Sequence, residues 1–186
     1  MKKEGFFFNM NTCIGCGACQ VACKDHNNLQ PGEFFRRFET MRLEGKDGPV
    51  YGHYSGSCNH CEDPVCVKAC PTGAMYVEEG GAVLHNASLC IACGSCVWTC
   101  PYGSISFSQD TGYAQKCDSC IDLRKEGKEP NCCHACPTRS LRYGNFEEFE
   151  KEYPGLVSEF PGMPDAERYK PALKIKLSKN LEKEDV

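Results

Sequence analysis

Cysteine is the residue whose abundance and spacing indicate the chemistry of this chain. There are 17 cysteines among 186 residues, a proportion typical of a disulfide-bonded scaffold or of a metal-binding protein. They fall into four groups: Cys13, Cys16, Cys19 and Cys23; Cys58, Cys61, Cys66 and Cys70; Cys90, Cys93, Cys96 and Cys100; and Cys117 and Cys120 with Cys132, Cys133 and Cys136. A motif that recurs in this way predicts several copies of one kind of ligand site.

The spacing within the groups indicates iron–sulfur clusters. The first group, CIGCGACQVAC, and the third, CIACGSCVWTC, both follow C-x2-C-x2-C-x3-C, and Pro101 follows the third. In bacterial ferredoxins this spacing places three thiolates on one [4Fe–4S] cluster and the fourth thiolate on a neighbouring cluster. The second group follows C-x2-C-x4-C-x3-C and precedes Pro71, so we interpret it as the same motif with two residues added.

Other uses of clustered cysteines fit the sequence less well. Disulfide frameworks belong to exported proteins, and we expect no export signal in MKKEGFFFNMNTCIGC, which has neither a cleavage pattern nor a twin-arginine pair. Structural zinc sites typically use two separated C-x2-C pairs. The C-x3-C-x2-C motif of radical enzymes does not occur in any group. A zinc-stabilised binding module and a purely structural use of clusters stay open as alternatives.

The pairing of the groups follows from the crossed fourth ligands. The second and third groups are connected by a predicted hairpin around Gly80 and Gly81, so they exchange fourth ligands, and the first group is left to pair with the fourth. The resulting sets are named site 1 (Cys13, Cys16, Cys19, Cys136), site 2 (Cys58, Cys61, Cys66, Cys100), site 3 (Cys90, Cys93, Cys96, Cys70) and site 4 (Cys117, Cys120, Cys132, Cys23). We therefore predict four [4Fe–4S] clusters in a line, with iron bound through these cysteines.

The adjacent Cys132 and Cys133 compete for one position in site 4. Taken alone, Cys117, Cys120, Cys133 and Cys136 resemble the two C-x2-C pairs of a zinc ribbon. In the other groups, however, the last two ligands are spaced C-x3-C, and only Cys132 has this spacing to Cys136. We therefore predict that Cys132 is the ligand and that Cys133 is a buried or partly buried free thiol and not a ligand.

The elements that must position these thiols predict an α+β fold of two joined bacterial-type 2[4Fe–4S] ferredoxin-like modules, stabilised by the clusters. A short strand-like segment follows each of Pro71, Pro101 and Pro137. Residues 1–30 and 108–152 are predicted to form an outer module, residues 31–57 a strand-rich insertion, residues 58–107 an inner module, and residues 153–186 an extended tail.

Two of these segments lie outside the ligand motifs. The insertion is rich in aromatic residues, and its two strands are predicted to turn between Gly45 and Gly48. The tail has four prolines and many charges, so we expect it to be extended and to contact a partner. Because no run of about 18 apolar residues occurs, we expect a soluble protein without a membrane span. The net charge of −4 argues against nucleic-acid binding.

Several residues near the ligands carry weaker signals. Trp98, within the third group, is expected to pack over a cluster and to exclude water. Lys24, Lys68 and Lys116 flank ligands, and they either offset the negative charge of the clusters or are ordinary surface residues. Three histidines near the motifs are interpreted as solvated or hydrogen-bonded loop residues, because cysteines fill the ligand positions; these are His26, His60 and His134.

The four motifs together closely resemble the iron–sulfur, electron-transfer subunit of the anaerobic dimethyl sulfoxide reductase family of molybdopterin oxidoreductases. The resemblance covers about residues 5–145 and rests on NTCIGCGACQVACKDHNNL, SGSCNHCEDPVCVKACPTGAMYV, LCIACGSCVWTCPYG and KCDSCIDLRKEGKEPNCCHACPTRSLRYG, in this order. It implies an electron-transfer subunit with four [4Fe–4S] clusters and no catalytic site of its own. It also implies two partners: a molybdenum or tungsten pterin catalytic subunit, and an integral-membrane anchor that reacts with quinone, or another redox protein.

A free-standing polyferredoxin carrier is an alternative with the same cofactors, although the long insertion and tail argue against it. We expect the protein to be associated with the cytoplasmic membrane through its partners. It would lie on the cytoplasmic side or, if exported together with a signal-bearing partner, on the opposite side. The terminal substrate and the direction of electron flow are expected to be set by the partners.

Overall fold

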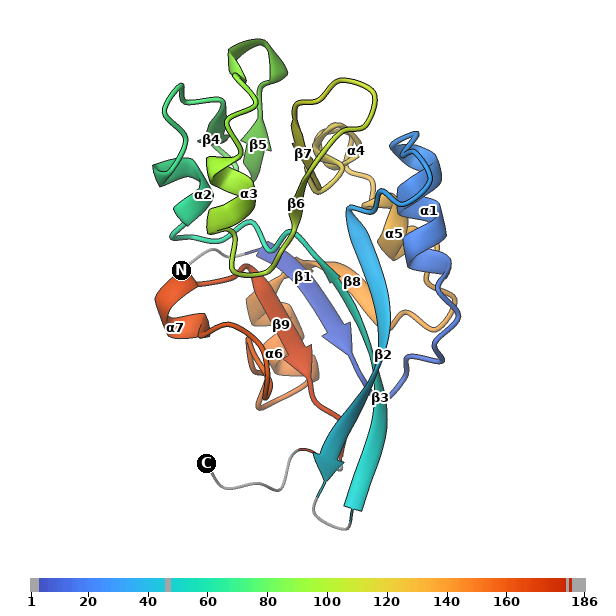
Figure 1. Cartoon of the computed structure of the whole chain (residues 1–186). Helices are drawn as coiled ribbons and strands as arrows, with labels where there is room; N and C mark the ends of the chain where they lie inside the picture. Colours follow the sequence, from blue (N-terminus) through green and yellow to red (C-terminus); the bar gives the residue numbers. More distant parts are fainter. Residues whose placement is uncertain (1–3, 46–47, 180, 182–186) are drawn as a thin grey trace.

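The structure is a computed structural model that describes residues 4–45, 48–179 and 181. The strands are β1 Glu4–Asn9, β2 Arg36–Gly45, β3 Gly48–Ser57, β4 Met75–Val77, β5 Val83–His85, β6 Ile105–Phe107, β7 Ala114–Lys116, β8 Leu141–Asn145 and β9 Leu173–Lys176. The helices are α1 Ala18–His26, α2 Val65–Lys68, α3 Ser95–Thr99, α4 Ile121–Lys125, α5 Asn131–His134, α6 Phe146–Glu152 and α7 Ala166–Tyr169, with a 3-10 turn, η1, at Ala87–Leu89. The mixture of short helices and strands that the sequence predicts is confirmed (Figure 1).

Strand β1 is the centre of the main sheet and accounts for the three consecutive phenylalanines near the N-terminus. It pairs with β8 in antiparallel and with β9 in parallel orientation. Because successive side chains of a strand point to opposite faces, Phe6 and Phe8 enter the main hydrophobic core, whereas Phe7 stacks on Phe149 and Tyr153 behind the sheet. The sheet therefore joins the segment before the first cysteine group to the segment after the fourth.

The three Cys-Pro pairs end short helices and precede strands. Strand β4 follows Pro71, β6 follows Pro101, and β8 follows Pro137, as the sequence predicts. Proline cannot continue a helix, and α2, α3 and α5 all end before it. The hairpin expected around Gly80 and Gly81 also forms, because β4 and β5 pair in antiparallel register. Among the described residues, no helix is long and apolar enough to cross a bilayer.

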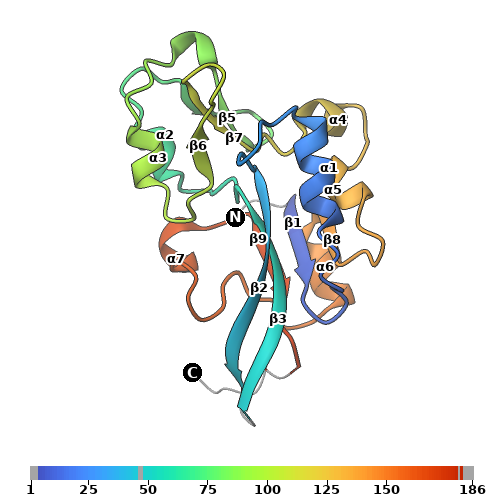
Figure 2. The same cartoon turned by 45° about the vertical axis from the view of Figure 1, so that its right-hand side comes forward.

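The insertion between the first two cysteine groups is a long antiparallel hairpin. Strands β2 and β3 pair from Arg36 opposite Ser57 to Gly45 opposite Gly48, so the chain turns where the sequence pattern placed the turn. Residues 46–47 lie outside the described residues. The start of β2 packs against α1, and the hairpin runs from there past the central sheet to the opposite end of the molecule (Figure 2).

The C-terminal segment differs from the extended tail predicted for residues 153–186. It forms α7 and β9 and adds Phe160 and Ile175 to the main core. Its low content of apolar residues was misleading, because Leu173 and Ile175 alternate along β9 and both point into the core. The strand also covers an edge of β1 that would otherwise be open. Residues 180 and 182–186 lie outside the described part of the tail.

Truncating Ile175 tests this correction. The side chain has an exposed fraction of 0%, so Ile175→Ala is expected to lower the free energy of unfolding by about 2–5 kcal/mol through lost burial and a residual cavity. The measurement is denaturant-induced unfolding of the anaerobically purified protein. Val21→Ala is the control, because Val21 is 66% exposed. Equal unfolding midpoints for the two variants would show that β9 does not belong to the core.

Candidate iron–sulfur centres

Four short helices bring the candidate thiols together in pairs. Residues four positions apart lie on the same side of a helix, and each helix carries or precedes two candidate ligands with this spacing. The pairs are Cys19 and Cys23 in α1, Cys66 and Cys70 in and just after α2, Cys96 and Cys100 in and just after α3, and Cys132 and Cys136 in and just after α5. Helix α1 packs against α5, and α2 against α3. The four thiols that each helix pair supplies therefore lie in a common region.

Two cavities beside the second and third cysteine groups are lined by thiols. One is lined by the four thiols of site 2, Cys58, Cys61, Cys66 and Cys100. The other is lined by the four thiols of site 3, Cys70, Cys90, Cys93 and Cys96. Each cavity is thus lined by three thiols from one of the two motifs and one thiol from the other. Within the described residues, no three His, Cys, Asp or Glu side chains converge on a single metal ion.

The thiols of site 1 gather where α1 begins. Burial raises the pKa of Cys13, and the neighbouring Cys19, Cys136 and Cys16 raise it further by charge repulsion. The Cys19 sulfur lies 3.2 Å from the hydroxyl oxygen of Ser55 on β3. Site 1 therefore combines three thiols of the first motif with the last cysteine of the fourth.

The thiols of site 4 are more deeply buried. Burial raises the pKa of Cys23 to about 12, and its neighbours Cys132 and Cys120 act in the same direction. Burial also raises the pKa of Cys117 well above the usual value, and the neighbouring Cys23 acts in the same direction. The Cys23 and Cys117 thiols therefore keep their protons at neutral pH without a metal, and metal binding would release these protons. None of the 17 cysteines forms a disulfide.

Cys132 and Cys133 face different neighbours although they are adjacent on α5. Cys132 lies beside Cys23, whereas Cys133 has an exposed fraction of 0% and lies near Tyr143 in the core. A hydrogen bond from the Cys133 thiol lowers the pKa of Cys132, and burial raises the pKa of Cys133. Cys132 is therefore the one of the two that faces the other thiols of site 4.

The first C-x2-C loops of the four cysteine groups share one backbone conformation. The second residue between the two cysteines has a positive φ in every loop: Gly15 at 72°, His60 at 43°, Ala92 at 55° and Ser119 at 61°. This conformation turns backbone N–H groups toward the sulfurs, with Ala92 N 3.5 Å from Cys90 Sγ and Ser119 N 3.3 Å from Cys117 Sγ. Such nests of N–H groups bind anions, including iron–sulfur clusters. The donor set and the loops therefore fit [4Fe–4S] clusters.

Two side chains of β3 that the sequence did not single out contact site 1. A Cβ atom on Gly15 would lie 2.8 Å from the His53 ring, so glycine lets this ring pack on the ligand loop. The ring Nδ1 is 3.0 Å from the Thr40 hydroxyl. His53 and Ser55 share one face of β3 because they are two residues apart. This alternation along the strand was the only signal in the sequence that could have indicated that His53 and Ser55 face the same site.

Two buried cations lie near the sites. Lys116 is 6% exposed, and its ammonium donates hydrogen bonds to the carbonyl oxygens of Val83 and Cys117. Arg36 is 2% exposed and lies beside site 4. Lys68 is different, since it is an exposed residue that pairs with Asp63. Lys24 is half-buried, and its ammonium donates hydrogen bonds to the carbonyl oxygens of Gln30 and Glu33. Lys116 was one of three lysines flagged by the sequence, whereas Arg36 was missed.

The histidines near the motifs behave as the sequence predicts. His26 and His134 are exposed. The Nδ1 atom of His60 accepts a hydrogen bond of 3.0 Å from the Val83 N–H. The three side chains are thus solvated or hydrogen-bonded, but only His60 lies in a loop, since His26 and His134 are the last residues of α1 and α5.

Trp98 does not cover a cluster site, contrary to expectation. Its side chain is 84% exposed, and its indole lies over Gly94, where a Cβ atom would be 3.0 Å from Nε1. Residues two positions apart do not face the same side of a helix. Because Cys96 points into the core, Trp98 has to point away from it.

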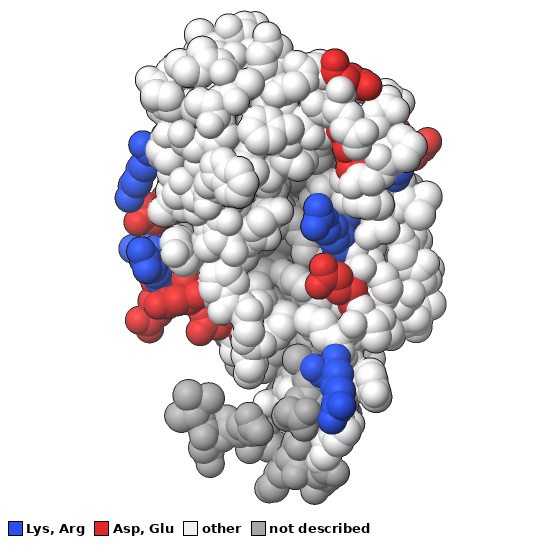
Figure 3. Space-filling view, viewed as in Figure 1, with Lys and Arg blue, Asp and Glu red and all other residues white. Residues whose placement is uncertain are grey.

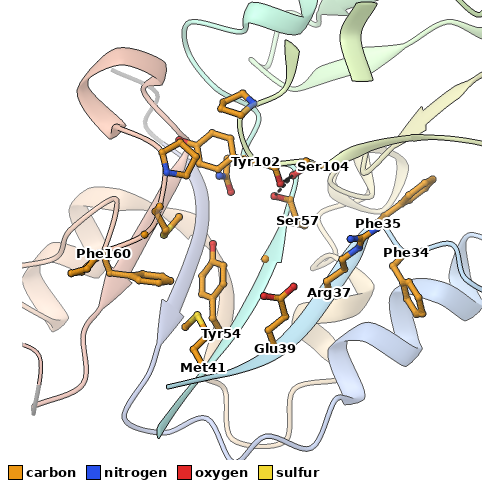
Figure 4. Close-up of a pocket in the computed structure, with 18 of the residues that line it drawn as sticks. Phe34, Phe35, Arg37, Glu39, Met41, Tyr54, Ser57, Tyr102, Ser104 and Phe160 are labelled. Carbon is orange, nitrogen blue, oxygen red and sulfur yellow. Dashed lines mark hydrogen bonds between the residues drawn. The ribbon is translucent and has the colours of Figure 1, made fainter. Parts of the chain in front are cut away.

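A groove lies beside site 2 but contains none of the candidate ligands. It has a volume of about 540 Å³ and lies between the hairpin, the loop after Cys100 and residues 160–164. Figure 3 shows it as a hollow with basic and acidic side chains along one rim. Tyr54, Tyr102 and Phe160 surround it from three segments (Figure 4). Its aromatic lining distinguishes it from the two thiol-lined cavities.

Comparison with known proteins identifies the domains and the relatives of this protein. Two models described as 4Fe-4S dicluster domains match residues 50–146 and 12–74. The sequence is 40% identical to the B subunit of anaerobic dimethyl sulfoxide reductase of Escherichia coli (strain K12), over 96% of this chain and 90% of that protein. It is 41% identical to the thiosulfate reductase electron transfer subunit PhsB of Salmonella typhi, over 74% and 73%. It is 35% identical to the B subunit of polysulfide reductase of Wolinella succinogenes, over 86% and 85%.

The two domain matches together span all four cysteine groups. They support the ferredoxin-like character that the cysteine spacing predicts, and the resemblance drawn from the four motifs is confirmed. With its two 4Fe-4S dicluster domains, this protein belongs to the family of iron–sulfur subunits that includes the B subunit of anaerobic dimethyl sulfoxide reductase.

Proposed function

We propose that this protein is the electron-transfer subunit of a membrane-associated oxidoreductase complex and relays electrons through four [4Fe–4S] clusters in sites 1 to 4. One partner is a molybdopterin catalytic subunit, and the other is a quinone-reactive membrane anchor or another redox protein. Each cluster, when bound, accepts and releases electrons. The observation that supports the proposal is the proximity of the thiols in four groups, each with three thiols from one motif and one from its partner motif.

The positions of the sites support a single row. Sites 3 and 2 share α2 and α3, and sites 4 and 1 share α1 and α5. The two pairs meet where Cys58 of site 2 comes close to Cys117 of site 4. The order of the sites is therefore 3, 2, 4, 1, with the deeply buried Cys117 near the middle.

The two ends of this row are the exposed ones. Cys93 of site 3 and Cys16 of site 1 are exposed, whereas every cysteine of site 4 is buried. Exposed apolar side chains accompany both ends: Leu89, Ile91 and Trp98 at site 3, and Ile14 and Val21 at site 1. Helices α3 and α1 lie on opposite sides of the molecule (Figures 1 and 2). We assign one partner to each end, since electrons must enter at one end and leave at the other.

Iron content tests the ligand sets. The native protein is expected to hold about sixteen iron atoms per molecule as four clusters, whereas stoichiometric zinc without iron would contradict the proposal.

Cys132→Ser should lose about four iron atoms or convert one cluster, because a thiolate ligand of site 4 is removed. Cys133→Ser is the matched control and should keep the full iron content. The opposite result for the two serine variants would exchange their roles. Iron and acid-labile sulfide analysis measures the iron content of each variant, and electron paramagnetic resonance of the reduced protein detects its clusters.

Copurification tests the two ends. Val21→Glu and Trp98→Glu each place a charge in an exposed apolar area, at site 1 and site 3 respectively. Each variant is expected to lose a different partner and keep its iron, because desolvating an unpaired carboxylate at an interface is unfavourable. Tyr51→Glu is the control, since Tyr51 is 71% exposed on the hairpin, away from both ends. Retention of both partners by both end variants would refute this assignment, and isolation as a free monomer would favour a soluble carrier.

A further inference from the structure

Arg36 is the largest of the fully buried side chains of this protein. It is the first residue of β2, and β3 holds its guanidinium: Nη1 donates a hydrogen bond of 2.8 Å to the Ser55 carbonyl oxygen, and Nη2 donates one of 2.8 Å to the Ser57 hydroxyl. The guanidinium also lies over the Phe6 ring, 4.5 Å from its centroid. These contacts fix the position of the charge.

The charge of Arg36 lacks the partner that a buried cation normally has. Among the residues that the structure describes, no carboxylate forms an ion pair with Arg36, and its Nε–H has no hydrogen-bond partner. Removing a guanidinium from water costs several kcal/mol unless an anion compensates. The neighbours that can supply negative charge are thiols. Those with the largest electrostatic effect on the guanidinium are Cys132, Cys133, Cys117 and Cys23.

Three of these four thiols belong to site 4. The backbone N–H of Arg36 also acts on the Cys23 sulfur as a hydrogen-bond donor. Both the main chain and the side chain of Arg36 are therefore directed at the same site. The neighbouring Arg37 is exposed on the other face of the strand, as the alternation of a strand requires.

A fixed positive charge beside a redox centre changes its potential. A cluster held by four thiolates is an anion, and reduction adds one more negative charge. In a buried place, where water screens poorly, a cation stabilises the more negative, reduced form. Net charge and hydrogen bonds near the sulfurs are among the factors that set cluster potentials.

We propose that Arg36 is the tuning residue of site 4 and raises the reduction potential of the cluster bound there. A weaker effect reaches site 1, because Nη1 of Arg36 also lies 3.3 Å from the Ser55 hydroxyl, which is 3.2 Å from the Cys19 sulfur. Site 3 is lined by Cys70, Cys90, Cys93 and Cys96, and no residue of β2 borders it. Its cluster therefore serves as an internal reference. The inference rests on the ligand sets proposed above.

The experiment is a potentiometric titration of the anaerobically purified native complex, followed by electron paramagnetic resonance. The signal altered in Cys132→Ser identifies site 4. Arg36→Gln keeps a hydrogen-bond donor and removes the charge. We therefore expect the ratio of reduced to oxidised site 4 cluster at a fixed potential to fall at least tenfold, which corresponds to a reduction potential lower by about 59 mV for one electron. Arg36→Lys keeps the charge and should stay near the native potential. Arg37→Gln and the site 3 signal should not shift.

The outcomes separate tuning from a structural role. An unchanged site 4 potential in Arg36→Gln, or an equal decrease in Arg36→Lys, would overturn the inference. If Arg36→Gln does not assemble the site 4 cluster, Arg36→Lys provides the test. A native site 4 potential in Arg36→Lys supports tuning by charge, whereas a lowered potential or a missing cluster in this variant contradicts it. Absence of iron from the unmodified protein would instead refute the proposed function, so the two failures are distinguishable.

Discussion

With the proposed ligand sets, the architecture depends on one constraint: two cysteines one helical turn apart must serve two different sites. Each of α1, α2, α3 and α5 holds a pair of cysteines with the spacing that this arrangement requires. A helix that feeds two sites has to lie between them, so a second helix must approach from the opposite side to complete both sets. The packing of α1 on α5 and of α2 on α3 follows from this requirement. The short length of the helices also follows, because the proline after the last cysteine of three groups ends them.

The constraint also explains why the N-terminal segment and the fourth group are joined. Their thiols belong together only if residues near 20 and residues near 130 are held side by side. The β1–β8 pairing supplies that connection, with Phe6 and Phe8 anchoring the sheet in the core between. The C-terminal segment strengthens it, since β9 adds to the other edge of β1. The hairpin contributes polar groups beside sites 1 and 4, with Ser55 next to Cys19 of site 1 and Arg36 next to the thiols of site 4.

Burial of thiols has an electrostatic consequence that differs along the row. At the two ends, Cys16 and Cys93 are open to solvent, and water or a partner can respond to charge. In the middle, Cys23 and Cys117 are enclosed, and only fixed groups of the protein can respond. Arg36 and Lys116 are such groups, and both are located at this buried centre. Burying these two cations would be unfavourable on its own. Beside sites proposed to hold anionic clusters, the negative charge of the clusters compensates them.

The sequence by itself determined the features that depend on local order. The cysteine spacing, the prolines that stop helices, the hairpins at Gly80 and Gly81 and at Gly45 to Gly48, and the family follow from short-range rules. The ligand sets and module boundaries remain predictions from the same rules.

The tertiary structure decided what depends on distant segments. Average composition suggested a loose tail, but two alternating apolar residues sufficed to dock β9 on β1. Proximity to a ligand suggested that Trp98 packs over a cluster, but the turn of the helix directs its side chain to solvent. No spacing rule distinguishes Arg36 from Arg37, because which face of a strand is buried is set by the elements that pack on it. Only the fold places that charge beside thiols from three other parts of the sequence.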